Sequence, residues 1–175
     1  MIPDDFRPIR RDHPDFPPRP EPVDLAAARR LGPAAAVEAK WEHMARSWKW
    51  SAEYAVVRSP SRVYPRIVEL VAAARAVPEL RRLYPFTSHM ILKFSSTTTI
   101  PYEVRLPSVE PLADGRFRVR RGGGVLGEFD GTGEALALVL AHAPPGLGPA
   151  LPRLRACRRC ARGKARAAPA ACDSA

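Results

Sequence analysis

Asp114-Gly115-Arg116-Phe117-Arg118-Val119-Arg120 combines a turn signal with strict alternation of basic and apolar residues. Asp-Gly is among the strongest short hairpin signals, because both residues tolerate the backbone angles of a tight turn. Alternation places Phe117 and Val119 on one side of a strand and the arginines on the other. The stretch therefore predicts a hairpin strand with an apolar flank for the core and a basic flank that faces away from it.

The same period of two extends to both sides of this stretch. Gly122, Gly123 and Gly124 allow a second tight turn, and an anion-binding nest of backbone amides is the alternative interpretation of these glycines. Strands that follow one another so closely favour an antiparallel meander. We expect four short strands, at 89–94, 102–106, 116–120 and 125–129.

Before residue 89 and after residue 131 the apolar residues recur with the period of a helix. Asp24 and Thr132 are residue types that cap helix N-termini. Helices beside an antiparallel sheet make an α+β domain, here with N-terminal helices packed on a meander of about four strands and followed by a C-terminal helix. The expected helices are 25–31, 34–57, 64–77, a short turn at 79–83, and 133–143.

Composition divides the chain into three parts: a proline-rich arm at 1–23, a single α+β domain at 24–150, and a basic tail at 151–175. The first 22 residues contain seven prolines, so we expect the arm to be disordered or in a polyproline conformation. Its segment Phe16-Pro17-Pro18-Arg19-Pro20 also fits a ligand of a proline-binding protein. Genomic coding bias toward proline and arginine is the simpler explanation of that segment.

Most of the net charge of +10 belongs to the tail. Up to Ala150 there are 21 basic and 17 acidic residues, a balance of +4, whereas the last 25 residues have seven basic residues and only Asp173, a balance of +6. A disordered basic tail can bind nucleic acid weakly and without sequence preference, since it has no aromatic residue for base stacking. An extension without a selected function is the alternative.

One face of the expected sheet is basic. Alternation places the apolar residues of each strand toward the helices and leaves the other face with five cations that could bind an anion such as phosphate or carboxylate. An ordinary solvated sheet face is the alternative. Ile91 and Leu126 fall on this polar side, so part of it is expected to be covered or one strand to be out of register. The candidate anion-binding residues are His89, Lys93, Arg105, Arg116, Arg118 and Arg120.

No pattern in the sequence indicates catalysis, a metal or a cofactor. Cys157 and Cys160 make half of a zinc site and Cys172 adds a third thiolate, but the tail provides no fourth ligand. The hydroxyls at 95–99 are without an adjacent base and fit a polar turn. We therefore expect no catalytic residue, no metal and no cofactor. The acidic start and the absence of a long apolar run predict a cytoplasmic protein without a membrane segment.

Three segments, 80–89, 109–119 with Gly127-Glu128, and 134–146, resemble a domain-of-unknown-function family of high-GC bacteria that is labelled natural product biosynthesis protein. The similarity runs from about residue 37 to residue 150. It implies an association with biosynthetic loci and gives no catalytic residues. Neither the arm nor the tail is covered by it.

Three hypotheses for function follow. The first is a non-catalytic accessory protein of natural product biosynthesis that binds a protein partner or an anionic small molecule. The second is a small tailoring enzyme that uses the polar sheet face, with His89, Lys93 and Arg105 nearest to its site. The third is nucleic-acid binding through the tail.

Overall fold

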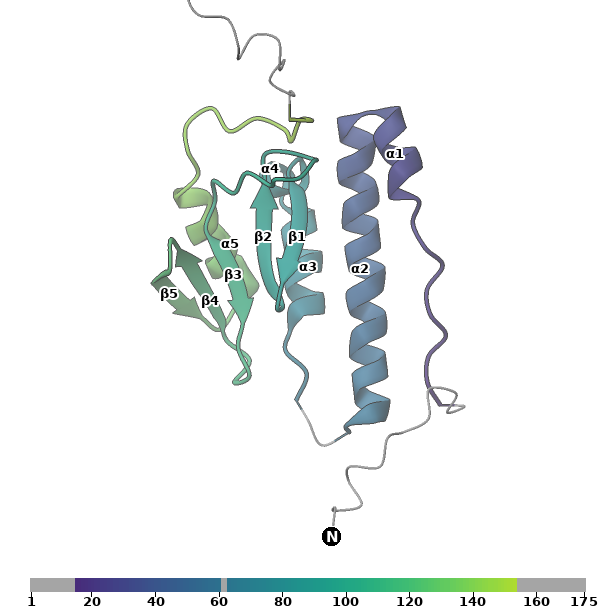
Figure 1. Cartoon of the computed structure of the whole chain (residues 1–175). Helices are drawn as coiled ribbons and strands as arrows, with labels where there is room; N and C mark the ends of the chain where they lie inside the picture. The colour runs from purple at the N-terminus through teal and green to yellow at the C-terminus, as the bar shows by residue number, and fades with distance from the viewer. Residues whose placement is uncertain (1–14, 61–62, 154–175) are drawn as a thin grey trace, which may run out of the picture.

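The computed structural model describes residues 15–60 and 63–153. Helices precede and follow a single five-stranded antiparallel sheet, which confirms the α+β arrangement (Figure 1). The helices are α1 (Leu25–Leu31), α2 (Pro33–Arg58), α3 (Ile67–Ala76), α4 (Pro78–Arg81) and α5 (Thr132–Ala141). Asp24 caps α1 as expected, because its carboxylate accepts hydrogen bonds from the backbone amides of Ala26 and Ala27. The cap of α5 is Gly131 rather than Thr132.

The sheet is a meander in which each strand pairs with the next one along the chain. Its order is β1-β2-β3-β4-β5, with β1 at Tyr84–Ser88, β2 at Ile91–Ser95, β3 at Ser108–Pro111, β4 at Phe117–Arg121 and β5 at Gly124–Phe129. Both glycine-containing turns are where the sequence places them. Gly115 closes the β3–β4 turn, and Gly122 and Gly123 form the β4–β5 turn with φ values of 55° and 90°. Gly122 and Gly123 thus make a hairpin turn, and Gly124 is the first residue of β5.

The strand β1 is absent from the sequence-based prediction, which expected four strands. In the sequence, Pro85 favours the end of the helical half, because a residue before proline avoids the α region. For this reason no strand is predicted at 84–88. A proline is tolerated here because β1 is an edge strand, where an amide need not be donated to a neighbour. The prediction that His89 begins a strand is wrong. His89 and Met90 form the turn between β1 and β2, with φ values of 51° and 67°.

The strand expected at 102–106 is also wrong, because the third strand lies at 108–111. Val104 makes only an isolated bridge with Ser95. Hydroxyl groups hold the preceding loop: the Ser95 Oγ accepts hydrogen bonds from the amides of Thr97 (3.0 Å) and Glu103 (3.1 Å). This shift of the third strand places Glu110 in the sheet, with consequences for the charge of its open face.

Helices cover one face of the sheet, and the other face is open. In Figure 1 the helices α3 and α5 lie behind the sheet, and α2 runs along β1. Phe117 and Val119 are both completely buried on the helix side, whereas Arg118 and Arg120 alternate outward. The central sequence-based expectation, an apolar flank against the helices and arginines on the far side, is therefore confirmed.

A bulge in β5 explains why strict alternation places the apolar residue Leu126 on the polar side of the sheet. Val119 pairs with Gly127, and the next residue, Arg120, pairs with Val125, so Leu126 is left as the extra residue. A Cβ at Gly127 would lie 2.9 Å from the ring of Phe129, so a larger residue there would force that ring to move. The expectation that one strand is out of register is thus correct for β5.

Arg75 of α3 forms ion pairs with two carboxylates of α2. Its guanidinium pairs with Glu38 and with Glu42 (3.0 Å), and the hydrogen bond from Arg75 lowers the pKa of Glu38. Arg46 and then Arg75 lower the pKa of Glu42. Since both folded-state pKa values are depressed, the pairs stabilise the fold above the ordinary carboxylate pKa and lose this effect as the pH falls through the folded-state value.

We therefore expect Arg75→Gln to lower the free energy of unfolding at neutral pH by about 0.5–1 kcal/mol, a modest amount because these groups are partly exposed. The difference from the wild type should disappear at acid pH. Urea denaturation of both proteins over a pH series measures this. Arg30→Gln on α1 is the control and should change little, and a difference that persists at acid pH would contradict the assignment to carboxylate pairing.

Among the described residues, no helix is long and apolar enough to cross a membrane.

Candidate anion-binding site

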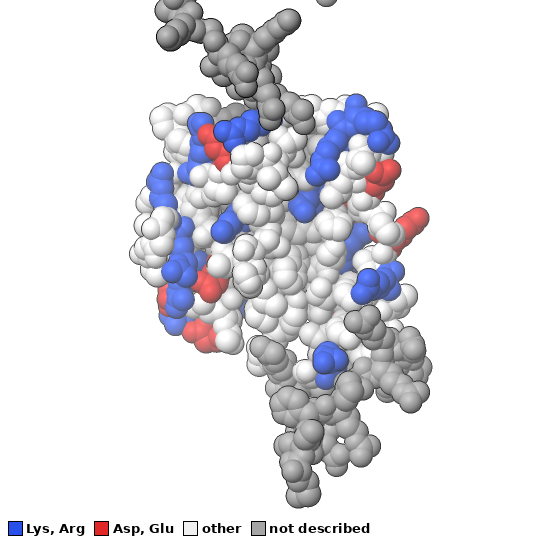
Figure 2. All heavy atoms as spheres, in the orientation of Figure 1, with Lys and Arg blue, Asp and Glu red and all other residues white. Residues whose placement is uncertain are grey.

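The open face of the sheet carries a ladder of ion pairs on its β3, β4 and β5 strands. Glu128 binds Arg116 (2.8 Å) and Arg118 (2.7 Å), and Glu110 lies 3.8 Å from Arg118 and 3.5 Å from Arg120. Figure 2 shows the same arrangement as basic and acidic side chains interleaved over β4 and β5. Three of the five cations expected on this face are therefore paired within the ladder.

Arg116 has a second acidic partner at the end of the ladder. Its guanidinium binds Asp114 (2.8 Å), and its backbone amide and side chain both donate hydrogen bonds that lower the pKa of Asp114. Arg116 is thus paired on two sides, with Asp114 and with Glu128. An anion that approached Arg116 would have to displace carboxylates that the fold already holds there.

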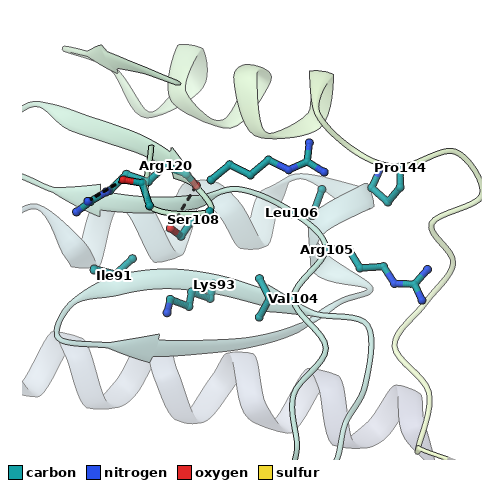
Figure 3. Close-up of a pocket in the computed structure, with 11 residues that line it drawn as sticks. Ile91, Lys93, Val104, Arg105, Leu106, Ser108, Arg120 and Pro144 are labelled. Carbon is teal, nitrogen blue, oxygen red and sulfur yellow. Dashed lines mark hydrogen bonds between the residues drawn. The ribbon is translucent and has the colours of Figure 1, made fainter. Parts of the chain in front are cut away.

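A hollow of about 650 Å³ lies beside the ladder, where β2, the 104–108 loop and the β4–β5 turn meet (Figure 3). Four of its lining residues are basic: Lys93, Arg105, Arg120 and Arg121. No acidic residue is among the residues of the described chain that line it. The others are Ile91, Val104, Leu106, Ser108, Gly122, Gly123 and Pro144.

The four basic side chains differ in how far they are already engaged. Arg105 is paired with Glu103 (2.9 Å), and Arg120 donates a hydrogen bond to the carbonyl oxygen of Gly123 (3.3 Å) in addition to its pair with Glu110. Lys93 and Arg121 have no ion-pair partner within 4 Å among residues 15–60 and 63–153. Lys93 lies between Ile91 and Val104 in Figure 3, and Arg105 extends away from it.

The structure thus divides the six candidate residues predicted from the sequence. Lys93, Arg105 and Arg120 line the hollow, Arg116 and Arg118 belong to the ladder, and His89 lies in the β1–β2 turn outside both. The sequence analysis missed Arg121 as a site residue. The sequence feature that indicates Arg121 is its position directly before the glycine turn. A side chain at that end of the strand lies beside the hollow.

The hydroxyl cluster at 95–99 is part of a folded loop. The Ser95 Oγ donates to the carbonyl oxygen of Thr97 (2.8 Å), and Ser95, Thr97 and Thr98 are all buried. The hydroxyls of Ser95 and Thr97 form hydrogen bonds with the backbone, in agreement with a polar turn. The described part of the chain also contains no group of three metal-ligating side chains. Cys157, Cys160 and Cys172 lie outside the described residues.

Comparison with protein-family models gives one match, which covers residues 35–153, more than half of the chain. This chain belongs to the family of unknown function DUF6193. The resemblance of the sequence to a family of unknown function is thereby confirmed. No curated protein and no solved structure matches the chain.

The ladder leads to a prediction for this family member at Glu110. One oxygen of its carboxylate, Oε2, is buried between Arg118 and Arg120 and has no hydrogen-bond partner among the residues that the structure describes. Glu110→Gln removes the charge that holds Arg120. If pyrophosphate binds in the hollow, we therefore expect its affinity to rise about two- to fivefold, equivalent to about 0.5–1 kcal/mol. Calorimetric titration measures this change. Glu53→Gln on α2 is the control, since it changes the net charge equally. A loss of affinity in Glu110→Gln would contradict the conclusion that Glu110 competes with the anion for Arg120.

Proposed function

We propose that this chain is a small cytoplasmic accessory protein of natural product biosynthesis that binds an anionic small molecule in the hollow and catalyses no reaction on it. The observation that carries the proposal is the lining of the hollow, where four basic side chains meet without an acidic one among the described residues. The link to natural product biosynthesis depends on the resemblance of the three sequence segments.

The chemistry of the hollow favours carboxylate or phosphate groups. A guanidinium can donate two parallel hydrogen bonds to one oxyanion, and an ammonium adds a compact charge. The hollow has one group of each kind on opposite sides. The ammonium of Lys93 comes from the middle of β2, and the guanidinium of Arg121 comes from the end of β4. The apolar side chains of Ile91, Val104 and Leu106 can contact the carbon skeleton of a ligand.

Binding without catalysis is the better interpretation of the same lining. General acid–base or nucleophilic catalysis needs a proton-transferring group within reach of the reacting atom. The only hydroxyl among the lining residues of the described chain is that of Ser108, which donates to the carbonyl oxygen of Arg120. His89, which the enzyme hypothesis places near its site, is in the β1–β2 turn and is not among the residues that line the hollow.

The hypothesis of nucleic-acid binding concerns residues that lie almost entirely outside the described part of the chain. It stays a prediction for the basic tail. Among the described residues that line the hollow, none is aromatic and could stack on a base, so its four cations are better suited to a small anion.

Calorimetric titration of the full chain tests the proposal, with pyrophosphate and citrate as probes and sorbitol as the neutral control. We expect saturable one-site binding of at least one anion and none of sorbitol. The affinity should fall as sodium chloride is added, because salt screens partly exposed charges. Absence of saturable binding of both anions would contradict the proposal.

A further inference from the structure

A second surface lies on α2, beside the segment of chain that leads to α1. Residues 15–24 run alongside α2 in Figure 1. Their segment Phe16-Pro17-Pro18-Arg19 faces Trp50 and Tyr54, two aromatic residues one helical turn apart. Ring stacking joins these two side chains, whose centroids are 5.2 Å apart.

Among the described residues, a hydrogen bond, a ring stack and a cation–π contact hold the segment against this aromatic pair. The Trp50 indole Nε1 donates a hydrogen bond to the carbonyl oxygen of Pro17 (3.0 Å). The ring of Phe16 stacks on Tyr54 with centroids 4.5 Å apart and an interplanar angle of 22°. The Arg19 guanidinium lies 5.5 Å from the centroid of the Trp50 ring, within the range of a cation–π contact.

These contacts are those by which proteins recognise proline-rich segments. Such a segment is extended and already restricted before it binds, so binding costs little conformational entropy. Its backbone carbonyls are free of internal hydrogen bonds, and an aromatic groove with an indole N–H can accept its rings and donate to one carbonyl. The Trp50 contact to Pro17 is of this kind.

The groove is larger than the part that the segment occupies. A hollow of about 1180 Å³ adjoins the segment, and its other walls include Trp48, Tyr64, Met90 and Ala113. Since Pro17 and Pro18 form one wall, further ligand residues could pack beside the aromatic pair.

We propose that this groove on α2 is a recognition site for a proline-rich segment of a partner protein, one with an aromatic residue before a Pro-Pro pair and an arginine after it. The chain's own Phe16–Arg19 segment occupies the site when the partner is absent. Because the segment is tethered close to the groove, a partner has to displace it and binds more weakly than to an open site. This inference goes beyond the proposed function, which concerns a separate hollow with no lining residue in common with the groove.

The test uses the full chain and a synthetic peptide, Asp-Phe-Pro-Pro-Arg-Pro-Glu, the sequence of residues 15–21. The double variant Phe16→Ala, Arg19→Ala weakens the hold of the chain's own segment. The matched control is Leu31→Ala, Arg30→Ala, which removes the same kinds of side chain from the exposed surface of α1. The indole N–H resonance of Trp50, assigned by its loss in Trp50→Phe, reports the site in each protein.

We expect the Trp50 indole resonance to shift in the double variant but not in the control, and the peptide to restore it. The peptide should bind the double variant about tenfold or more tightly than the wild type, as expected when a competing segment is removed. A peptide with alanine in place of both central prolines should not bind. An unshifted resonance, or a shift that the peptide cannot reverse, would overturn the proposal, since the segment would then be a fixed structural strap.

Discussion

Replacement of Trp41 by alanine is expected to lower the free energy of unfolding by about 3–5 kcal/mol, the range for deleting a large buried aromatic side chain. Trp41 is completely buried in α2 and packs against Phe94 of β2, with ring centroids 6.4 Å apart. Its indole Nε1 also donates to the carbonyl oxygen of Arg81 at the end of α4 (2.9 Å). One side chain thus connects three elements of the fold.

The variant Trp41→Phe separates the two contributions. It keeps a ring in the core but removes the indole donor, so we expect a smaller loss of about 1–3 kcal/mol from a smaller volume and an unpaired carbonyl. Urea denaturation followed by circular dichroism measures both variants. A loss below about 1 kcal/mol in Trp41→Ala would contradict the packing described here.

The double charge reversal Lys93→Glu, Arg121→Glu is expected to weaken the binding of pyrophosphate about 30-fold or more. Both side chains line the hollow and neither has an ion-pair partner within 4 Å in the described part of the chain. A charge-assisted contact contributes about 1–2 kcal/mol when it is partly exposed, so the loss of two contacts amounts to roughly 2–3 kcal/mol or more.

The matched control is Arg30→Glu, Lys49→Glu, which changes the net charge equally at exposed positions of α1 and α2. It should reduce the affinity by no more than about twofold, through the weaker overall field alone. Calorimetric titration of both proteins distinguishes a site from a general attraction. Equal losses in the two variants would mean that the anion is held by net charge, including the basic tail.

The sheet could be predicted from the sequence because two independent signals agree within one stretch. Asp114-Gly115 fixed the turn, and the alternation of Phe117 and Val119 with arginine fixed which side is buried. The edge strand β1 could not be predicted in this way. Pro85 is compatible with a strand only at an edge, and the edge is defined by strand pairing that one sequence does not reveal.

The site could be predicted only in part for a similar reason. The alternation of apolar and basic residues along the strand predicts that Arg116 and Arg118 face outward. It does not reveal which carboxylates lie beside them on the neighbouring strands. Glu110 enters the sheet because the third strand starts at Ser108, after a loop held by the hydroxyl of Ser95. That displacement places Glu110 beside Arg118 and Arg120, whereas Lys93 and Arg121 have no ion-pair partner within 4 Å in the part of the chain that the structure describes.

The most direct test of the account is a map of anion binding on the backbone amides of the full chain. Pyrophosphate is added stepwise while two-dimensional NMR spectra are recorded, and shifts are assigned residue by residue. If the anion binds in the hollow, we expect saturable shifts to be concentrated at Lys93 and along Arg120–Gly123, with little change at Arg116, Arg118 and Glu128. Shifts centred on those three ladder residues, with Lys93 and Arg121 unaffected, would contradict it.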